Sequence, residues 1–376
     1  MSLCGAEVAS CCCAILAMSV QCAAMPLKIV QVVKRYGPVG GMERYVWELS
    51  RELQLLGHQV TVLCERCHAE FPAGINVVEL GETAKRPRWL SQVRFSANVS
   101  RWINGHPCAG RVIHSHERLG VHDVTTFHGP PFATIYEKGW WHFISLRVWV
   151  RLYLERRELE TAQIVVPNSS FISRQLSHYY PVLASKLSSP VAPGILPIKP
   201  RRAHSVPGNG GVVCFVGWEW QRKGLPLAMS VFATLRRKRP DLELWVVGPD
   251  PVELASLFAS WSGGYRLLGW REDSDYLSEA DVLLHPARAE PYGMVISEAM
   301  SAGVPVVISD VCGAAEHVAE EAGTVLPLSA SVEVWASAVE KQLNRSEPVP
   351  LFDRSWARVA QEYELIYREI FKAKLK

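Results

Sequence analysis

The length, composition and charge of the chain narrow what kind of protein it is. Its 376 residues exceed one ordinary domain and fit two domains of about 150 to 200 residues each. Hydrophobic residues make up 48% and charged residues 20%, which excludes a disordered, collagen-like or coiled-coil chain. The net charge of +3 is far below that of a dedicated nucleic-acid binder, so we expect no nucleic-acid partner.

Residues 1–24 form an apolar N-terminal extension rich in cysteine and alanine. The segment carries no Lys or Arg, and Glu7 is its only charged side chain, so it fits neither a signal peptide nor a spanning helix. A buried-strand pattern starts directly after Met25. We therefore expect Met25 to be the native start. No other window is long and apolar enough for a membrane span.

The ten cysteines do not form a disulfide framework. Five lie within the first 22 residues and the others are scattered, as expected for reduced thiols of a cytoplasmic protein. Cys64 and Cys67 have CxxC spacing, but without a second pair the pattern indicates a strand end rather than a zinc site.

Short apolar runs alternate with amphipathic ones from Met25 onward. Between the first two runs lies a helix on which Val46, Leu49, Leu53 and Leu56 share one face. This alternation predicts a parallel sheet with helices packed on it. The expected strands are 27–34, 59–64, 75–80, 111–115, 123–127 and 164–167.

A proline-rich passage from Pro181 to Gly211 marks an interdomain linker, after which the alternation restarts. The sequence thus predicts two α/β domains, each a doubly wound Rossmann-like sheet, at 25–200 and 201–354, followed by a C-terminal helix at 355–376. Two such sheets facing each other form a cleft between their carboxyl ends. The expected strands of the second domain are 212–217, 242–248, 265–268, 281–285 and 304–308, and its helices are 224–238, 251–260, 274–280 and 293–302.

Two strand-to-helix turns have anion-binding chemistry. The segment 37–44 places Gly40 and Gly41 at the start of the first helix, where glycines let backbone N–H groups approach an anion; a merely tight turn explains it equally well. Arg222 and Lys223 follow the first strand of the second domain. The guanidinium of Arg222 can donate two parallel hydrogen bonds and Lys223 supplies a point charge, which together suit a diphosphate.

The segment 285–307 is the most specific of the motifs. Glu290 precedes a helix and Glu298 lies about two turns along it, so both carboxylates can accept hydrogen bonds from sugar hydroxyls. The free N–H groups near Gly293 and Met294 suit a phosphate. Together these features indicate a nucleotide-sugar site.

These motifs together resemble the retaining glycosyltransferases of family 4, which have the GT-B fold. The resemblance rests on Glu290-Pro-Tyr-Gly with Glu298 and Gly303-Val-Pro-Val-Val, on Arg222-Lys-Gly, on Pro193-Gly-Ile and on Gly40-Gly-Met-Glu-Arg. The segments 283–287 and 310–313 are most similar to the enzymes that build the lipopolysaccharide core.

The resemblance implies roles for the matching positions. Catalysis is implied for Arg222, Lys223, Glu290 and His128, the last in the Thr-Phe-His-Gly segment after a first-domain strand. Gly40, Gly41 and Arg44 would form a phosphate and acceptor loop. Donor binding is implied for Gly217, Arg222, Lys223, Glu290, Tyr292, Gly293, Met294, Val295 and Glu298. The family needs no metal and no cofactor, since the nucleotide sugar is a substrate.

Two sequence patterns could form metal sites, and we expect neither of them to bind a metal ion. Asp273-Ser-Asp275 has DxD spacing, but it stands at a helix start, where Asp and Ser are common caps. No cysteine or carboxylate completes a zinc site with the four histidines 114, 116, 122 and 128.

The segment 140–157 mixes tryptophans with arginines, as a helix on an anionic membrane surface does. An ordinary core helix with arginines on its wet face explains the segment equally well. A second basic and aromatic strip comprises Arg86, Arg88, Trp89, Arg94, Arg101 and Trp102, and it suits a phosphorylated glycolipid acceptor.

The sequence therefore predicts a glycosyltransferase that moves a hexose or heptose from a nucleotide sugar to a glycolipid, the lipopolysaccharide core. It would act in the cytoplasm, peripherally at the inner membrane. Two alternatives stay open: a soluble transferase or synthase of another glycan, and a non-catalytic subunit that binds nucleotide sugars. A Rossmann oxidoreductase fits less well, because no GxGxxG motif with a downstream acidic partner is present.

Overall fold

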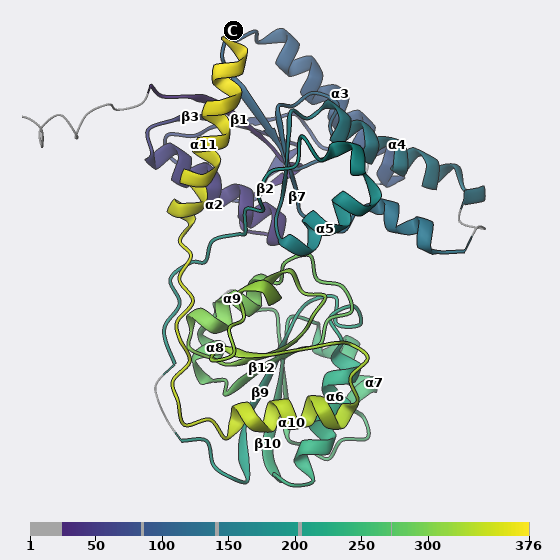
Figure 1. Ribbon diagram of the computed structural model, residues 1–376, viewed down its shortest axis with the longest axis vertical. Coiled ribbons are helices and arrows are strands. Elements are labelled where there is room, and N and C mark those ends of the chain that lie inside the picture. The colour runs from purple at the N-terminus through teal and green to yellow at the C-terminus, as the bar shows by residue number, and fades with distance from the viewer. Residues whose placement is uncertain (1–24, 84–85, 140–142, 202–204, 272, 376) are drawn as a thin grey trace, which may run out of the picture.

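The chain folds into two α/β domains stacked one on the other (Figure 1). The computed structural model describes residues 25–83, 86–139, 143–201, 205–271 and 273–375. The N-terminal extension and Trp140, Trp141 and His142 of the aromatic segment lie outside the described residues.

The first domain is built on six parallel strands in the order β5-β3-β1-β6-β7-β8. All six strands expected from the sequence are present, most with slightly shorter bounds. They are β1 (Lys28–Val32), β3 (Gln59–Cys64), β5 (Asn76–Glu79), β6 (Val112–Ser115), β7 (Val124–Phe127) and β8 (Ile164–Pro167). A separate two-stranded ladder of β2 (Arg35–Tyr36) and β4 (Arg66–Cys67) was not expected.

The second domain repeats this plan with the order β11-β10-β9-β12-β13-β14. Its strands are β9 (Gly210–Val216), β10 (Asp241–Val247), β11 (Tyr265–Gly269), β12 (Val282–His285), β13 (Val306–Ser309) and β14 (Gly323–Leu326). The last of these was missing from the sequence-based expectation. All the pairings within both sheets are parallel, so both domains are doubly wound sheets, as predicted.

Helices cover both faces of each sheet. The first domain has α2 (Gly41–Leu55), α3 (Arg88–Gly105), η1 (Phe132–Glu137), α4 (Leu146–Thr161), α5 (Ser170–Tyr179) and η3 (Pro181–Leu183). The second has α6 (Leu225–Arg236), α7 (Pro251–Phe258), α8 (Asp275–Glu279), α9 (Met294–Ser301), η4 (Gly313–His317) and α10 (Val332–Leu343), and α11 (Trp356–Lys374) ends the chain. The amphipathic helices bury their apolar faces against the strands, which gives each sheet a core on either side.

The strand order reverses at the first strand of each sheet, between β1 and β6 and between β9 and β12. Ligands of open α/β sheets bind beyond the carboxyl ends of the strands at this point. The segments that follow β1, β7, β9 and β12 therefore supply the site.

The chain crosses between the domains twice, and the two crossings lie side by side (Figure 1). The Ile195 N–H donates to the Arg354 carbonyl at 2.8 Å, and the Arg354 side chain donates to the Ala192 carbonyl at 3.0 Å. Trp356 lies so close to Gly194 that a Cβ there would clash with it. After the second crossing α11 returns to pack on α2 of the first domain.

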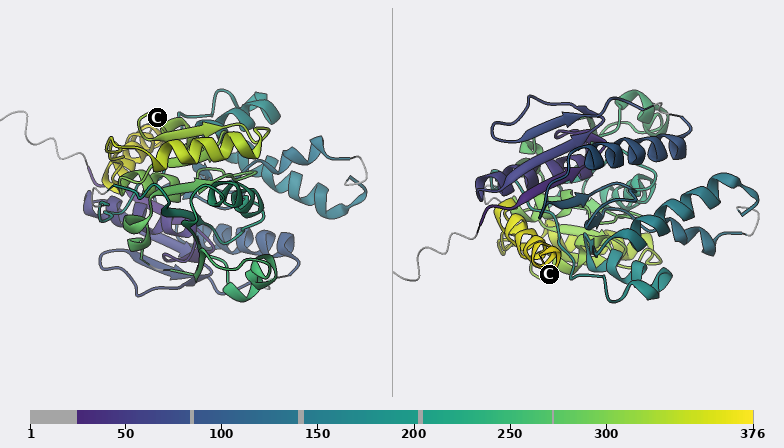
Figure 2. Two further views of the ribbon diagram at one scale, coloured as in Figure 1. Left: turned by 90° about the horizontal axis from the view of Figure 1, so that it is seen from below. Right: turned by 90° about the horizontal axis from the view of Figure 1, so that it is seen from above.

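A hairpin made of η1 and α4 projects from the side of the first domain (Figure 2). Its surface carries exposed apolar side chains, among them Ile144, Leu146 and Trp149. Across the described residues, no helix combines the length and the apolar character that crossing a bilayer requires.

Candidate active site between the two domains

A cavity of about 860 Å³ lies between the two domains. The loop after β1 and the start of α2 form its first wall. The loops after β9 and β11, together with α9, form the second. The lining brings together these positions selected from the sequence: Gly40, Gly41, Arg44, Gly217, Arg222, Lys223, Glu290, Met294 and Glu298.

Arg222 and Lys223 stand in the turn between β9 and α6 and point at one carboxylate. Lys223 Nζ lies 3.1 Å and Arg222 Nη1 lies 3.6 Å from Glu290 Oε2. Gly217 has φ of +154°, and the Lys223 side chain occupies the place where a Cβ would stand. A side chain at position 217 would therefore push the lysine out of its position.

Glu290 is buried in the loop between β12 and α9. Its carbonyl accepts the Gly313 N–H at 2.9 Å, and its Oε2 lies 3.5 Å from His285 Nε2. Burial alone would raise the pKa of Glu290, but Lys223, His285 and Arg222 outweigh burial and lower the pKa to about 2. Glu290 is thus an anion at neutral pH.

Glu298, two turns along α9, reaches across to the first domain. Its Oε1 lies 3.9 Å from Arg44 Nη1 on α2. Burial raises the pKa of Glu298, while Arg44 and Lys223 act against this rise. This contact joins two positions that the sequence analysis had assigned to different domains.

Two helix N-termini open toward the same cavity. Gly40 caps α2 and Gly293, with φ of +94°, caps α9, so no cap side chain accepts the first N–H groups of either helix. These N–H groups carry partial positive charge and can donate to an anion. At Gly40 a Cβ would meet the Glu43 carboxylate, so that side chain would have to shift.

Three expected donor-binding positions do not line the cavity. Tyr292 is buried in the core and its hydroxyl lies 2.9 Å from the Ser297 hydroxyl. Val295 also packs into this core, and Gly293 is buried. The side chains of Tyr292 and Val295 therefore support the α9 terminus from behind instead of facing a ligand.

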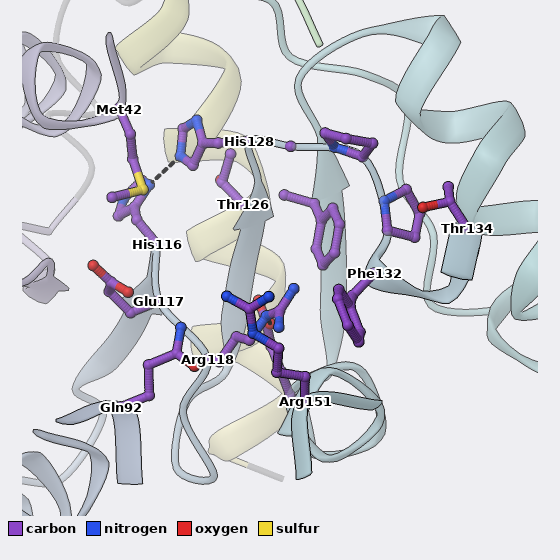
Figure 3. A pocket seen from close by; sticks show the side chains of 15 residues that line it. Met42, Gln92, His116, Glu117, Arg118, Thr126, His128, Phe132, Thr134 and Arg151 are labelled. Atoms are coloured by element: carbon purple, nitrogen blue, oxygen red, sulfur yellow. Dashed lines mark hydrogen bonds and ion pairs between the residues drawn. The ribbon is translucent and has the colours of Figure 1, made fainter. Parts of the chain in front are cut away.

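His128 lies apart from this cavity, in a pocket of about 360 Å³ within the first domain (Figure 3). It follows β7, and its Nε2 lies 2.8 Å from His116 Nδ1. Burial lowers the pKa of His128 to about 3, so the ring is neutral. Arg118 and Arg151 line the same pocket, and Met42 of α2 stands at its edge.

A third pocket of about 530 Å³ adjoins the second, since Gln92 and Glu117 line both. Lys34, Arg88 and Glu65 also line it. These two pockets follow the carboxyl edge of the first sheet and reach the interdomain cavity, which shares Arg35 and Glu43 with the third pocket.

The sequence analysis missed several residues of these pockets. Trp218 and Trp270 are exposed at the interdomain cavity, with ring centroids 6.4 Å apart. Their position after β9 and β11 was a usable signal, because these loops border the cleft. Glu158 is buried and Glu117 is partly buried, and burial raises the pKa of each to about 7. No local pattern in the sequence marks these two acids.

Within the part of the chain that the structure describes, no three or more His, Cys, Asp or Glu side chains converge on a possible metal position. Asp273 Oδ1 accepts the Asp275 N–H at 3.2 Å where α8 begins, as a capping residue does, whereas the Ser274 side chain makes no capping bond. Cys64 and Cys67 are both free thiols.

The chain matches two sequence families. Residues 39–188 match the family described as Glycosyltransferase Family 4, and residues 210–345 match Glycosyl transferases group 1. The first match covers the first sheet except β1, and the second match covers the whole second sheet.

Individual proteins agree with these matches. Lipopolysaccharide glucosyltransferase WaaG of Escherichia coli K12 is 25% identical over 88% of this chain and 92% of its own length. A crystal structure of WaaG, a glycosyltransferase involved in lipopolysaccharide biosynthesis, superposes with a TM-score of 0.73, over 92% of this chain and 98% of that chain, at 21% identity. Phosphatidyl-myo-inositol mannosyltransferase of Mycolicibacterium smegmatis is 26% identical over 90% of this chain and 92% of its own length. The fold also matches Anabaena Alr3699/HepE in complex with UDP and glucose, with a TM-score of 0.61 over 91% of this chain and 95% of that chain, at 17% identity.

Two facing Rossmann-like sheets, a charged cavity between them and the two family matches lead to one conclusion. The chain is a glycosyltransferase of family 4 with the GT-B fold.

Proposed function

We propose that this glycosyltransferase moves a hexose or heptose from a nucleotide-sugar donor to a glycolipid, the lipopolysaccharide core, with retention at the anomeric carbon. The observation that carries the proposal is the cluster in which Lys223 and Arg222 both face Glu290 in the interdomain cavity. A cluster of two cations and one carboxylate matches a substrate that carries a diphosphate next to sugar hydroxyls.

The second domain would hold the donor. Its diphosphate would lie against Arg222, Lys223 and the α9 N-terminus, the sugar hydroxyls against Glu290 and the ribose against Glu298. Two fixed cations in a closed cleft stabilise a departing diphosphate by themselves, so the proposed reaction uses no metal. The leaving phosphate would accept the proton of the attacking hydroxyl on the same face of the sugar.

The first domain would hold the acceptor, with His128 near the transferred sugar. Its two pockets, of about 360 and 530 Å³, continue from the interdomain cavity and are lined by Arg118, Arg151, Lys34 and Arg88. Several cations along an elongated site suit an acceptor that carries phosphate groups. WaaG, the lipopolysaccharide glucosyltransferase, supports this acceptor class.

The projecting hairpin would attach the enzyme to the cytoplasmic face of the inner membrane. Its exposed side chains Ile144, Leu146, Trp149 and Tyr153 stand beside the exposed Arg147. Apolar and aromatic side chains interleaved with arginine suit the headgroup region of an anionic bilayer.

A soluble transferase or synthase acting on another glycan is the second candidate. It is favoured by the range of relatives, which include a D-inositol 3-phosphate glycosyltransferase and an alpha-maltose-1-phosphate synthase. Both candidates use the same donor site, and they differ in the acceptor and in membrane attachment.

Calorimetric titration with UDP-, GDP- and ADP-sugars tests the donor site. We expect one donor class to bind, and Glu290→Ala to weaken that binding, because the variant loses the carboxylate that orients the sugar. Glu253→Ala, an exposed carboxylate on α7, is the matched control. Transfer assays with extracted glycolipid then separate the two candidates. Turnover on soluble acceptors alone would favour the second one.

A further inference from the structure

A continuous chain of hydrogen bonds runs from the C-terminal helix to His128. It joins two tyrosines of α11 to side chains of β1, β6 and β7, all of them buried except His128, which is partly exposed. The contacts in order are Val191 O to Tyr45 Oη 3.2 Å, Tyr45 Oη to Tyr363 Oη 3.0 Å, Tyr363 Oη to Thr126 Oγ1 2.6 Å, Thr126 Oγ1 to His114 Nε2 2.7 Å, His114 Nδ1 to Tyr367 Oη 2.6 Å, Tyr367 Oη to Gln31 Nε2 3.0 Å, Gln31 Oε1 to His116 Nε2 2.9 Å and His116 Nδ1 to His128 Nε2 2.8 Å.

The amide of Gln31 sets the direction of the bonds that reach His128. Its Nε2 donates to the Tyr367 hydroxyl, and its Oε1, which can only accept, faces His116 Nε2. Each hydroxyl in this series of bonds has one proton to donate, so Tyr367 gives its proton to His114 Nδ1. At the far end Tyr45 is a donor to the Val191 carbonyl and to Tyr363.

The histidines transmit this direction because they are neutral. Burial lowers the pKa of His114 and of His116 well below the ordinary value, so each ring carries one proton. His114 donates from Nε2 to Thr126 and accepts at Nδ1 from Tyr367. Tyr367 accepts from Gln31 Nε2, which leaves Gln31 Oε1 to accept from His116 Nε2.

We propose that Gln31, His116 and Tyr367 are positioning residues that hold His128 in its Nε2–H tautomer. His116 has its proton on Nε2, so its Nδ1 is an acceptor and His128 must donate to it from Nε2. His128 Nδ1 is then a bare acceptor, and no group among the described residues bonds to it. Such a nitrogen accepts a hydrogen bond from a sugar hydroxyl and cannot donate one to an oxygen.

This inference rests on the proposed function, since it concerns how His128 meets a sugar. The opposite direction is the alternative: the Tyr45 proton would leave Val191, the Gln31 amide would be flipped, and His128 would carry its proton on Nδ1. The two directions give His128 opposite hydrogen-bonding character at the same position.

Nitrogen NMR of the full chain labelled with ¹⁵N-histidine distinguishes the two directions. The His128 signals are identified by their loss in His128→Gln. We expect the Nε2 of His128 to give the shift of a protonated ring nitrogen and its Nδ1 the shift of a bare one at pH 7. A protonated Nδ1, or an averaged pair of shifts, would overturn the proposal.

Variants test whether the series of hydrogen bonds holds the His128 tautomer. Gln31→Leu and Tyr367→Phe both interrupt the series. We expect the two ring nitrogens of His128 to give averaged shifts, and turnover to fall about tenfold, as for one lost hydrogen bond. Affinity for the free nucleoside diphosphate should stay unchanged, because none of these hydrogen-bonded residues lines the interdomain cavity. Tyr36→Phe removes another buried tyrosine hydroxyl from the same domain and should change neither readout.

The outcomes separate this inference from the role proposed for His128. If the tautomer is as expected but His128→Gln turns over normally, the role in sugar contact fails and the proposal fails with it. If His128→Gln is impaired while Gln31→Leu keeps both the tautomer and the turnover, the positioning role alone is wrong.

Discussion

At the scale of single residues, the charges of the interdomain cavity neutralise one another. Lys223 and Arg222 face Glu290, Arg44 faces Glu298, and Arg222 also pairs with Glu219 at 2.7 Å. A diphosphate that enters the cavity can take over the cations while sugar hydroxyls take over the carboxylates. Each charge thus exchanges one partner for another instead of becoming buried alone, which limits the desolvation cost of binding.

Lys223→Ala tests this arrangement. We expect turnover to fall about a hundredfold or more, because a preorganised cation aimed at a leaving phosphate contributes that much to transition-state stabilisation. Steady-state kinetics with the identified donor measure it. Lys238→Ala removes an exposed lysine of the same domain, paired with Glu340, and should leave turnover unchanged. Near-normal turnover in Lys223→Ala would refute the role.

The sequence identified those residues of the cavity that local spacing determines. Arg222, Lys223, Glu290 and Glu298 follow strands or lie on one helix, so a short motif places them. The same motif does not give the direction of a side chain, which is why Tyr292 was selected although it faces the core. The chain of hydrogen bonds at His128 has no local signal at all. Its members come from residues 31 to 367, and only the folded structure brings them together.

At the scale of elements, the hairpin of η1 and α4 differs from its surroundings. It buries Val148 and Leu152 of α4, but on its outer side it presents exposed Tyr136, Ile144, Leu146, Trp149 and Tyr153. Such a cluster is unusual on the surface of a water-soluble domain and marks an interaction site. Its projection from the body leaves it free to approach a flat surface (Figure 2).

Trp149→Ser tests the membrane role of this hairpin. We expect binding to vesicles with anionic lipid to weaken about tenfold or more, since burying one such side chain contributes about 1.5 to 3 kcal/mol. Sedimentation at low salt measures the bound fraction. Val252→Ser changes an apolar residue on α7 that is still more exposed than Trp149, and it is the control. Equal binding of both variants would exclude the hairpin as the attachment point.

The elements also show what periodicity can predict. Apolar runs of four to eight residues identified most strands, because buried parallel strands have few polar positions. β14 was missed because Gly323–Leu326 is short and contains glycine and threonine. α10 was missed although Trp335, Val339 and Leu343 follow the helical spacing after the capping Ser331, so a systematic search would have found it.

At the scale of the whole molecule, the last helix stabilises the domain with which the chain begins. Val359, Tyr363, Tyr367 and Ile370 of α11 share one core with α2 and the first sheet. The first domain therefore completes its core only when the C-terminal segment has been synthesised and has folded back.

Ile370→Ala tests this dependence. We expect the free energy of unfolding to fall by about 2 to 5 kcal/mol, as for other buried large-to-small substitutions. Leu365→Ala on the same helix replaces a residue that is 68% exposed, and its effect should be close to zero. Urea denaturation followed by tryptophan fluorescence compares the two variants. Equal stabilities would mean that α11 does not contribute to the core of the first domain.

The paired crossings between the domains have a mechanical consequence. Both tethers lie together and are tied by the bonds between Ile195, Ala192 and Arg354, so they act as one hinge. A single hinge permits rotation about one axis and resists sliding of one domain along the other. Opening by such a rotation would separate Arg44 from Glu298 while Lys223 and Glu290, which lie in one domain, stay together. The donor pocket of the second domain would thus keep its shape while the first domain rotates away from it and back.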